Sequence, residues 1–439
     1  MPALKAAAHR TAQRLIDAGH TTYFAGGCVR DQLLGTSPKD YDIATAATPD
    51  EVQELFPRSN AIGAHFGVIL VKEEKFPFEI ATFRHDGSYK DGRHPESVTF
   101  STPEEDAQRR DFTVNGLFQD PTTGEIIDYV NGQADLHSKT LRAIGTPDDR
   151  FQEDALRLVR AIRFATVLDF KIDPTTWDAI CNNASLLSQI SAERVRDEFT
   201  RILTSPSRAR GFERLTDSGL MRHIVPEVYD LIGCEQPPQW HPEGDVYQHT
   251  RIMLDMLNES TSDELALAVL LHDIGKPATY TYDPTEDRIR FNGHDRVGAE
   301  MSELILRRLK YSNKTTEDVC AMVDNHMNFM NVQLMRTAKV KRFMARPTFE
   351  DEMELHRVDC GSSNGLTDNY DFLRAKETEF ASEPLIPPPL ITGKDLIEMG
   401  LQPGPSFKKI LGQIQTEQLE GNLKDRESAL AWARDAVMP

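Results

Sequence analysis

Two aspartates separated by a single residue, Asp40 and Asp42, lie in the stretch AGGCVRDQLLGTSPKDYDIAT at residues 25–45. On a strand, alternate side chains face the same side, so both carboxylates would share one face while Tyr41 or Ile43 is buried on the other. Two carboxylates this close repel each other unless a cation neutralises them, and paired Mg²⁺ ions are what phosphoryl transfer from a nucleoside triphosphate requires. The spacing therefore predicts a magnesium-dependent nucleotidyltransferase site.

A glycine pair, Gly26-Gly27, and Arg30 come shortly before these aspartates. Glycines let the backbone approach a ligand, and the N–H groups that open the next helix, together with Arg30, offer positive potential to a triphosphate. A lone Asp-x-Asp motif is more often a solvated turn or a salt-bridging pair. The agreement of the glycine pair, the arginine and the strand pattern favours the catalytic interpretation.

The same stretch resembles the head-domain signature of the class II tRNA nucleotidyltransferases, which comprise the CCA-adding enzymes and their bacterial poly(A) polymerase relatives. The segment RRDFTVN at residues 109–115 is similar to the second head motif of this family. The resemblance implies that Arg110, Asp111 and Asn115 line the nucleotide pocket, whereas on an arbitrary surface the two adjacent arginines would be a solvated pair. It also places a third acid, Glu79, beside the aspartates, although a strand glutamate is otherwise an ordinary surface residue.

A second informative segment, RFQEDALRLVRAIRF at residues 150–164, has apolar residues at helical intervals. Asp154 and Arg157 are three residues apart, so a continuous helix would place them on one exposed face. A carboxylate accepts from an exocyclic amine and a guanidinium donates to a ring acceptor, so this pair could accept cytosine and adenine and reject uracil and guanine. Without the resemblance, a surface ion pair is the simpler interpretation.

The resemblance implies that the Glu-Asp-x-x-Arg motif in this segment is the protein template for C and A. We include Arg160 and Arg163 of the same segment among the expected nucleotide-binding residues. Further along, Glu193, Arg194 and Arg196 are similar to the last neck motif of the family, which implies that they support the template helix and nearby RNA backbone. As isolated residues they would be charges on a helix surface.

The elements around these motifs predict the fold of the N-terminal part. Residues 4–19 have helical apolar spacing, and residues 65–74 and 76–84 read as two β-rich segments joined by a charged turn. We therefore expect a mixed α/β head, which the resemblance identifies as a small sheet of the polymerase-β-like nucleotidyltransferase type. Residues 84–108 are polar and rich in turn residues. The resemblance implies a flexible loop there that helps to switch nucleotides, at a full length that disfavours a CC-adding enzyme.

A different set of residues indicates a second metal site. The pair His272-Asp273 follows an apolar helical segment and precedes the sequence IGKP. Imidazoles and carboxylates together are ligands for Mg²⁺, Mn²⁺, Fe²⁺ or Ni²⁺ rather than for a structural zinc. A lone histidine would more often be a surface or core residue. Six residues resemble the ordered ligand set of the HD phosphohydrolase superfamily: His249, His272, Asp273, His294, His326 and Asp359.

The HD resemblance implies a divalent metal site with phosphatase or 2′,3′-cyclic phosphodiesterase activity. We interpret His241, Tyr247 and Asp324, which lie near these motifs, as neighbours outside the ligand set. Together the motifs predict an α/β head followed by an all-α neck, an HD body and a helical tail. The expected boundaries are 1–145 for the head, 146–208 for the neck, 209–380 for the body and 381–439 for the tail.

Composition limits the classes of protein that fit. The chain has 439 residues and a formal net charge of −19, which argues against non-specific coating of nucleic acid but allows a local basic groove. We find no apolar run long enough for a membrane span and no secretory signal, so we expect neither. The five cysteines have no Cys-x-x-Cys spacing, which is typical of a protein of the reducing cytoplasm.

The leading hypothesis is an enzyme that adds C and A to the tRNA 3′ end from CTP and ATP, without a nucleic-acid template and without an obligate protein partner. An A-adding enzyme that completes a tRNA ending in CC, or a bacterial poly(A) polymerase, would share these motifs. A third hypothesis is a metal phosphohydrolase whose head merely binds RNA. The intact pair of Asp40 and Asp42 argues against this last interpretation.

Overall fold

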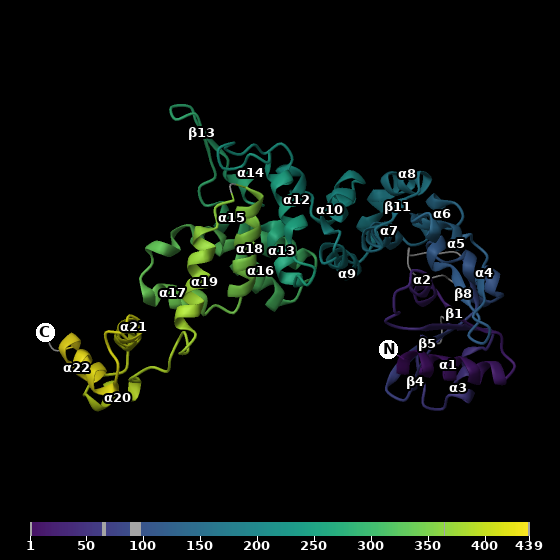
Figure 1. The fold of residues 1–439 in the computed structure, drawn as a ribbon, viewed down its shortest axis with the longest axis horizontal. Helices are drawn as coiled ribbons and strands as arrows, with labels where there is room; N and C mark the ends of the chain where they lie inside the picture. Colours follow the sequence, from purple (N-terminus) through teal and green to yellow (C-terminus); the bar gives the residue numbers. More distant parts are fainter. Residues whose placement is uncertain (1, 64–66, 88–97, 364, 438–439) are drawn as a thin grey trace. The chain divides into compact units, whose positions relative to one another are not determined.

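The computed structural model describes residues 2–63, 67–87, 98–363 and 365–437. They form two compact units (Figure 1), of which the first comprises Met1–Tyr229 with Arg308–Lys310 and the second comprises Asp230–Arg307 with Tyr311–Pro439. This division is coarser than the four parts expected from the sequence, whose boundaries stay a prediction.

A seven-stranded mixed sheet is the centre of the first unit. Strand β2 runs parallel to β5 and antiparallel to β1, and the other neighbours are antiparallel. The expectation of a mixed α/β head is thereby confirmed. In spatial order the strands are β3 (Asn60–Gly63), β4 (Val68–Glu73), β5 (Phe76–Thr82), β2 (Asp42–Thr45), β1 (Thr22–Ala25), β8 (Leu117–Gln119) and β9 (Ile126–Asp128).

The strand that was expected to carry both aspartates begins only at Asp42. Asp40 lies in the irregular segment before it, so the two acids are not both on the strand. The alternation of side chains is nevertheless the expected one, since Tyr41 and Ile43 are buried while Asp40 and Asp42 are exposed. The alternation extends past the hydrogen-bonded part of the strand because the chain is already extended there.

The segment 84–108 is not a loop throughout, which corrects the sequence-based expectation. Its ends pair as strands β6 (Arg84–Asp86) and β7 (Val98–Phe100), and it closes with helix α4 (Pro103–Gln108). Thr102 and Glu105 form a capping box, and Pro103 fits the first helical turn because it needs no N–H partner there. The part expected to be the flexible loop, residues 88–97, lies outside the described residues.

Helices surround this sheet and continue beyond it in the first unit (Figure 1). Helix α7 is buried along most of its length because it packs against α9 and α10. The remaining elements in chain order are α1 (Pro2–Asp17), α2 (Gly27–Leu33), α3 (Pro49–Leu55), η2 (Thr113–Asn115), α5 (Gly132–His137), β10 (Thr140–Leu141), α6 (Pro147–Glu153), α7 (Leu156–Val167), β11 (Lys171–Ile172), α8 (Pro174–Asn183), η3 (Ala184–Gln189), α9 (Ala192–Leu203), α10 (Arg208–Asp217), α11 (Met221–Ile224) and η4 (Pro226–Leu231).

In its described residues, the second unit is helical apart from the hairpin of β12 and β13. Its central helix, α13, is buried from Leu265 to Leu271 and is covered by α12, α16 and α18. The elements are α12 (Val246–Met256), α13 (Asp263–Leu271), α14 (Lys276–Thr279), β12 (Thr281–Asp283), β13 (Arg288–Arg290), α15 (His294–Arg308), α16 (Asn313–Asn325), η5 (His326–Leu334), α17 (Thr337–Met344), α18 (Phe349–Ser362), α19 (Asp368–Phe380), α20 (Gly393–Glu398), α21 (Pro405–Leu419) and α22 (Arg426–Val437). Within the described chain, we find no helix with the length and apolarity needed to span a bilayer.

Candidate functional site

The strand pairing in the first unit brings three acids together. Strands β2 and β5 are parallel neighbours with Ile43 opposite Ile80, so Asp42 and Glu79 each lie one position earlier on adjacent strands. Both side chains are exposed, on the face opposite the buried isoleucines. Asp40 lies close enough to Asp42 to act on its charge. The three expected acids therefore lie close together, on one face of the sheet at its two central neighbours β2 and β5.

The acids raise the energy of one another's charged forms. Burial by the surrounding protein, together with the negative charges of Asp40 and Glu79, raises the pKa of Asp42 to about 6, although Arg110 opposes them. A bound cation would relieve this repulsion, so the donor set fits a divalent metal ion. Among the described residues, only the second unit has groups of three donor atoms that lie within 4.8 Å of one another. The three acids of the head are spaced more widely than that.

The raised pKa of Asp42 predicts a trade-off between function and stability. A folded pKa above the unfolded value means that the free energy of unfolding falls as the pH rises from about 4 to about 6, and stays lower above that range. Without metal, Asp42→Asn should therefore increase the free energy of unfolding at about pH 7.5 by on the order of 1 kcal/mol, a value reduced for solvent screening. The gain should vanish near pH 4. Denaturant titrations in EDTA measure it, and an asparagine variant less stable than the wild type at the higher pH would contradict it.

Position 26 requires a glycine for two reasons, its backbone conformation and the close approach of a neighbouring side chain. Its φ of 69° lies in the left-handed region, and a Cβ at this position would lie 2.9 Å from Arg110 Nη1. The group that approaches this glycine is therefore the Arg110 guanidinium, which also donates to the carboxylate of Asp106. Asp106 is buried and also pairs with Arg109. The sequence analysis missed Asp106, whose only signal was its position three and four residues before two arginines.

A chain of hydrogen bonds joins the other expected nucleotide-binding residues. Arg30 Nη1 donates to Asn115 Oδ1 at 2.6 Å, and Asn115 Nδ2 donates to Asp111 Oδ1 at 3.1 Å. Arg160 Nε donates to Asp111 Oδ2 at 3.0 Å. Burial alone would raise the pKa of Asp111, but Arg160 and Asn115 lower it below its usual range. Asp111 is thus a buried anion that links the segment at residues 109–115 to helix α7.

The helix expected over residues 150–164 is broken at Asp154, which corrects the prediction that Asp154 and Arg157 share one helix face. Helix α6 ends at Glu153, and Asp154 is extended with φ −144° and ψ 102°. One carboxylate oxygen of Asp154 accepts from the N–H of Leu156, the first residue of α7, at 3.0 Å. The other accepts from Arg194 Nη2 at 3.0 Å. In this extended conformation, both oxygens of the carboxylate have a hydrogen-bond donor.

Arg157 is equally constrained, with only 9% of the residue exposed. Its guanidinium donates to Glu153 Oε2 at 2.6 Å and to the carbonyl of Arg109 at 3.1 Å. On the same helix, Arg163 donates to Glu198, a buried acid of α9 that the sequence analysis did not select. The structure thus brings the template motif and the neck motif into contact, while it places Arg157 away from an exposed face.

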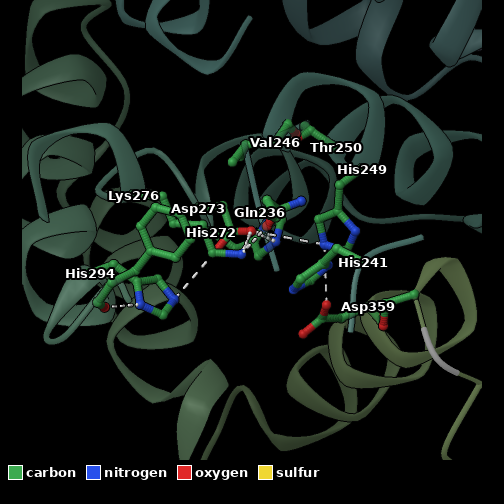
Figure 2. Close-up of polar contacts among 12 residues, drawn as sticks. Gln236, His241, Val246, His249, Thr250, His272, Asp273, Lys276, His294 and Asp359 are labelled. Atoms are coloured by element: carbon green, nitrogen blue, oxygen red, sulfur yellow. Dashed lines mark hydrogen bonds and ion pairs between the residues drawn. The ribbon is translucent and has the colours of Figure 1, made fainter. Parts of the chain in front are cut away.

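The second unit brings all six expected metal ligands close together. Figure 2 shows five of them, His249, His272, Asp273, His294 and Asp359. Three histidines make the same local contact, in which Nδ1 donates to the carbonyl three residues earlier. These distances are 2.8 Å for His272, 2.8 Å for His294 and 2.6 Å for His326. Because a carbonyl can only accept, Nδ1 carries the proton and Nε2 keeps its lone pair. This is the form of histidine that binds metal ions.

Asp273 lies at the centre of these Nε2 atoms. Its carboxylate is 3.0 Å from His272 Nε2 and 3.4 Å from His294 Nε2, while His249 Nε2 lies 3.2 Å from Asp359 Oδ1. The Nε2 atoms of His294 and His326 are only 3.1 Å apart. Burial and the neighbouring His272 lower the pKa of His326 to about 4, so that ring stays neutral. Facing lone pairs beside a carboxylate fit a divalent cation.

Glu243 is a functional candidate that the sequence analysis missed. His249 Nδ1 lies 2.7 Å from Glu243 Oε1, so the carboxylate accepts its proton and leaves Nε2 free for a metal. His241, which we had placed outside the ligand set, contacts the same oxygen at 2.9 Å. Glu243, His241 and His249 form one of the close donor groups of this unit. The available signal was their grouping within nine residues of the sequence WHPEGDVYQH.

A cavity of about 410 Å³ opens directly over this cluster. Asp273, His294, His326 and Asp359 form part of its lining. Lys276 also lines it and lies 2.7 Å from Asp273 Oδ2, which balances one of the buried charges. The volume lies within the range of ~300–1,000 Å³ that is usual for small-molecule sites. Solvent and a small phosphoester could therefore reach the ligand cluster.

Comparison with known proteins gives matches along the whole chain. Family models match residues 22–142 ("Poly A polymerase head domain"), 169–231 ("Probable RNA and SrmB- binding site of polymerase A") and 245–359 ("HD domain"). A CCA-adding enzyme of Streptococcus suis is 44% identical over 424 residues, which cover 95% of this chain and 93% of the relative. One from Levilactobacillus brevis is 30% identical over 430 residues, with 96% and 95% covered.

Solved structures are similar over the same extent. The crystal structure of a Bacillus stearothermophilus CCA-adding enzyme in complex with CTP matches with a TM-score of 0.76 at 27% identity, covering 98% of this chain and 96% of that one. A complex of a CCA-adding enzyme with ATP matches in fold, with a TM-score of 0.68 at 19% identity and 100% of this chain covered. The similarity therefore extends over both units of the chain.

Proposed function

Because this chain belongs to the CCA-adding enzyme family, we propose that it adds C and A residues to the 3′ end of tRNA from CTP and ATP, without a nucleic-acid template. The observation that carries this proposal is the cluster of Asp40, Asp42 and Glu79, with Arg110 close to Asp42. Strong mutual repulsion among acids is retained where a cation and a phosphate chain are to be bound. We also propose that the enzyme works in the cytoplasm and is divided at the residue boundaries given above.

In the proposed reaction, the primer 3′-hydroxyl loses its proton to solvent and its oxygen forms a bond to the α-phosphorus, while the bond from the α-phosphorus to the α–β bridging oxygen breaks and pyrophosphate leaves. Asp40, Asp42 and Glu79 would hold divalent ions, which we propose to be Mg²⁺ and which supply charge neutralisation at the transferred phosphate. Arg30 and Arg110 hold the triphosphate by charge-assisted hydrogen bonds. Gly26 leaves the space in which Arg110 takes up its position.

We assign the choice of base to Asp154 and Arg157. Both side chains are already positioned by the protein, Asp154 by Arg194 and Arg157 by Glu153. A carboxylate oxygen has more than one acceptor site, and the guanidinium has five donors, so each retains capacity for the edge of a base. The reversed polarity of uracil or guanine would set acceptor against acceptor at Asp154 and donor against donor at Arg157, which disfavours these bases.

Arg157→Ala should reduce kcat/KM for CTP and ATP by ~10- to 200-fold, because it removes hydrogen bonds to a charged group worth ~1.5–3 kcal/mol. Discrimination against UTP and GTP should fall as well. Single-nucleotide incorporation with each NTP measures both effects. Arg201→Ala, which removes a cation from the last turn of α9, is the control and should leave selectivity unchanged. Unchanged selectivity in the Arg157 variant would contradict the assignment.

The proposed function is tested with tRNAs that end at the discriminator base, at C and at CC, each incubated with one NTP at a time. We expect C on the first two substrates and A on the third. Addition of A to the CC form alone would identify an A-adding enzyme. Long A tails on any RNA would indicate a poly(A) polymerase.

A second activity is favoured by the ligand cluster of the second unit. We propose that it is a metal-dependent phosphohydrolase site for phosphomonoesters or 2′,3′-cyclic phosphodiesters. His249, His272, Asp273, His294, His326 and Asp359 would hold Mg²⁺, Mn²⁺ or Ni²⁺, which supplies an activated water and polarises the phosphate. Glu243 orients His249, and Lys276 keeps Asp273 ionised. The Nε2 atoms of His249 and His272 are buried without a hydrogen-bond partner of suitable geometry, which supports this use.

A further inference from the structure

One side of helix α7 is turned toward the segment at residues 109–115. Arg160 and Phe164 are four residues apart, which places them on the same side of the helix. Arg160 Nη2 donates to Asp111 Oδ2 at 2.5 Å, and the ring of Phe164 packs edge-on against that of Phe112, with centroids 5.8 Å apart. Phe164 therefore lies where α7 meets the segment whose polar residues we expect to bind the nucleotide.

The ring of Phe164 has three guanidinium groups around it. The Cζ atoms lie 3.9 Å from the ring centroid for Arg163, 5.2 Å for Arg160 and 5.4 Å for Arg30. All three distances are within the ~6 Å over which an aromatic ring attracts a cation. Arg30 belongs to helix α2, whereas the other two arginines belong to α7. The ring therefore connects cations from two separate elements.

Cations this close repel one another. Burial lowers the pKa of the Arg163 guanidinium, and the charge of Arg160 acts in the same direction, against that of Glu198. A further carboxylate at position 164 would ease this repulsion, but it would also repel the phosphates of an incoming nucleotide. A phenyl ring attracts cations through its quadrupole and has no net charge. Phe164 can therefore gather the cations without opposing an anionic ligand.

Arg30 is the member of this group that we assign to the triphosphate, and Phe164 links it to α7. The side chains of Arg30 and Arg163 are only 11% and 13% exposed, and Phe164 is 8% exposed. A contact between a cation and an aromatic ring is stronger where water is excluded than at an open surface. The contribution of the ring to the position of Arg30 is therefore large enough to be resolved by kinetics.

Resting on the nucleotide addition proposed above, we propose that Phe164 is a positioning residue for the triphosphate, whose uncharged ring holds the three guanidiniums where the phosphates of CTP or ATP bind. The ring acts on the phosphates alone, and the choice of base stays with the template motif. Weakening the attraction between the ring and the cations should therefore weaken the binding of every NTP by the same factor. A phenylalanine that merely fills space would not respond to such a change.

The test replaces Phe164 in the full chain with mono-, tri- and pentafluorophenylalanine, introduced by nonsense suppression. Fluorine withdraws electron density from the face of the ring and weakens its attraction for cations, while the side chain stays apolar and nearly keeps its shape. We expect KM for CTP and for ATP to rise stepwise along this series, to about tenfold with the pentafluoro ring. The kcat and the preference for CTP over UTP should stay at their wild-type values. The Kd of inorganic tripolyphosphate with Mg²⁺ should rise by the same factor as KM.

The same series at Phe199 is the control. Phe199 is fully buried on α9, and in the described part of the chain no cation lies over its ring, so fluorination there should leave KM unchanged. A KM that does not follow the fluorine series at Phe164, or a preference for CTP that falls with it, would overturn the proposal.

If the wild type incorporates no nucleotide, the proposed function fails, and calorimetry with tripolyphosphate and Mg²⁺ decides the inference separately. Binding that weakens along the series at Phe164 and not at Phe199 would support the inference. Binding that is unchanged along the series at Phe164 would overturn it.

Discussion

Asp42→Asn is expected to lower incorporation of CTP and ATP by at least ~10³-fold, the effect of losing several kcal/mol of transition-state stabilisation. The negative charges of Asp40 and Glu79 both act on the carboxylate of Asp42. The asparagine side chain keeps the shape of the aspartate but lacks the charge that would hold a cation. The loss should appear in kcat, since the metal acts on the reacting phosphate. Single-turnover incorporation onto a tRNA ending in CC measures it.

The same substitution should not weaken the fold, because removal of this charge relieves repulsion. Asp50→Asn is the matched control, since Asp50 is an exposed aspartate at the start of α3. We expect near wild-type incorporation from it. A folded Asp42→Asn protein that retains activity within tenfold of the wild type would rule out the acid cluster as the catalytic site.

Asp273→Asn is expected to abolish hydrolysis of adenosine 2′,3′-cyclic phosphate, by ~10³-fold or more, while incorporation of nucleotides persists. Asp273 is central to the ligand cluster, with His272 and His294 on its two sides. Burial would raise its pKa, but His272 and Lys276 lower it well below the usual range, so it is an anion at every working pH. Removing that charge removes the main attraction for a divalent ion.

Asparagine at this position leaves the buried Lys276 without its anion, which could cost ~3–5 kcal/mol of stability. Asp359→Asn is therefore measured in parallel, because Asp359 contacts His249 and is not paired with Lys276. We expect both variants to lose metal-dependent hydrolysis. If both hydrolyse the substrate at the wild-type rate, the cluster is not a phosphohydrolase site.

The common face of the two aspartates could be predicted from the sequence because the alternation of buried and exposed residues is a local pattern. Alternation along a strand separates Asp40 and Asp42 from Tyr41 and Ile43 whether or not the strand is fully hydrogen-bonded. Ordered histidines and aspartates likewise predicted the grouping of ligands in the second unit. In both cases the information lies within a few neighbouring residues or in a recurring order.

The break at Asp154 could not be predicted in this way. The apolar spacing around it is helical, but its carboxylate is satisfied by Arg194, forty residues further along the chain. A long-range partner of this kind decides which local pattern is realised. Glu243 was missed for a different reason, since its partner His249 is only six residues away and the signal was the grouping of His241, Glu243 and His249 in the sequence.

The most direct measurement is a crystal structure of this protein with CTP and Mg²⁺. The α-phosphate should lie against Asp40 and Asp42, and the amine edge of cytosine should face Asp154 and Arg157 in the same cleft. A triphosphate bound away from the two acids, or a cytosine edge that contacts neither Asp154 nor Arg157, would contradict the proposed site of nucleotide addition.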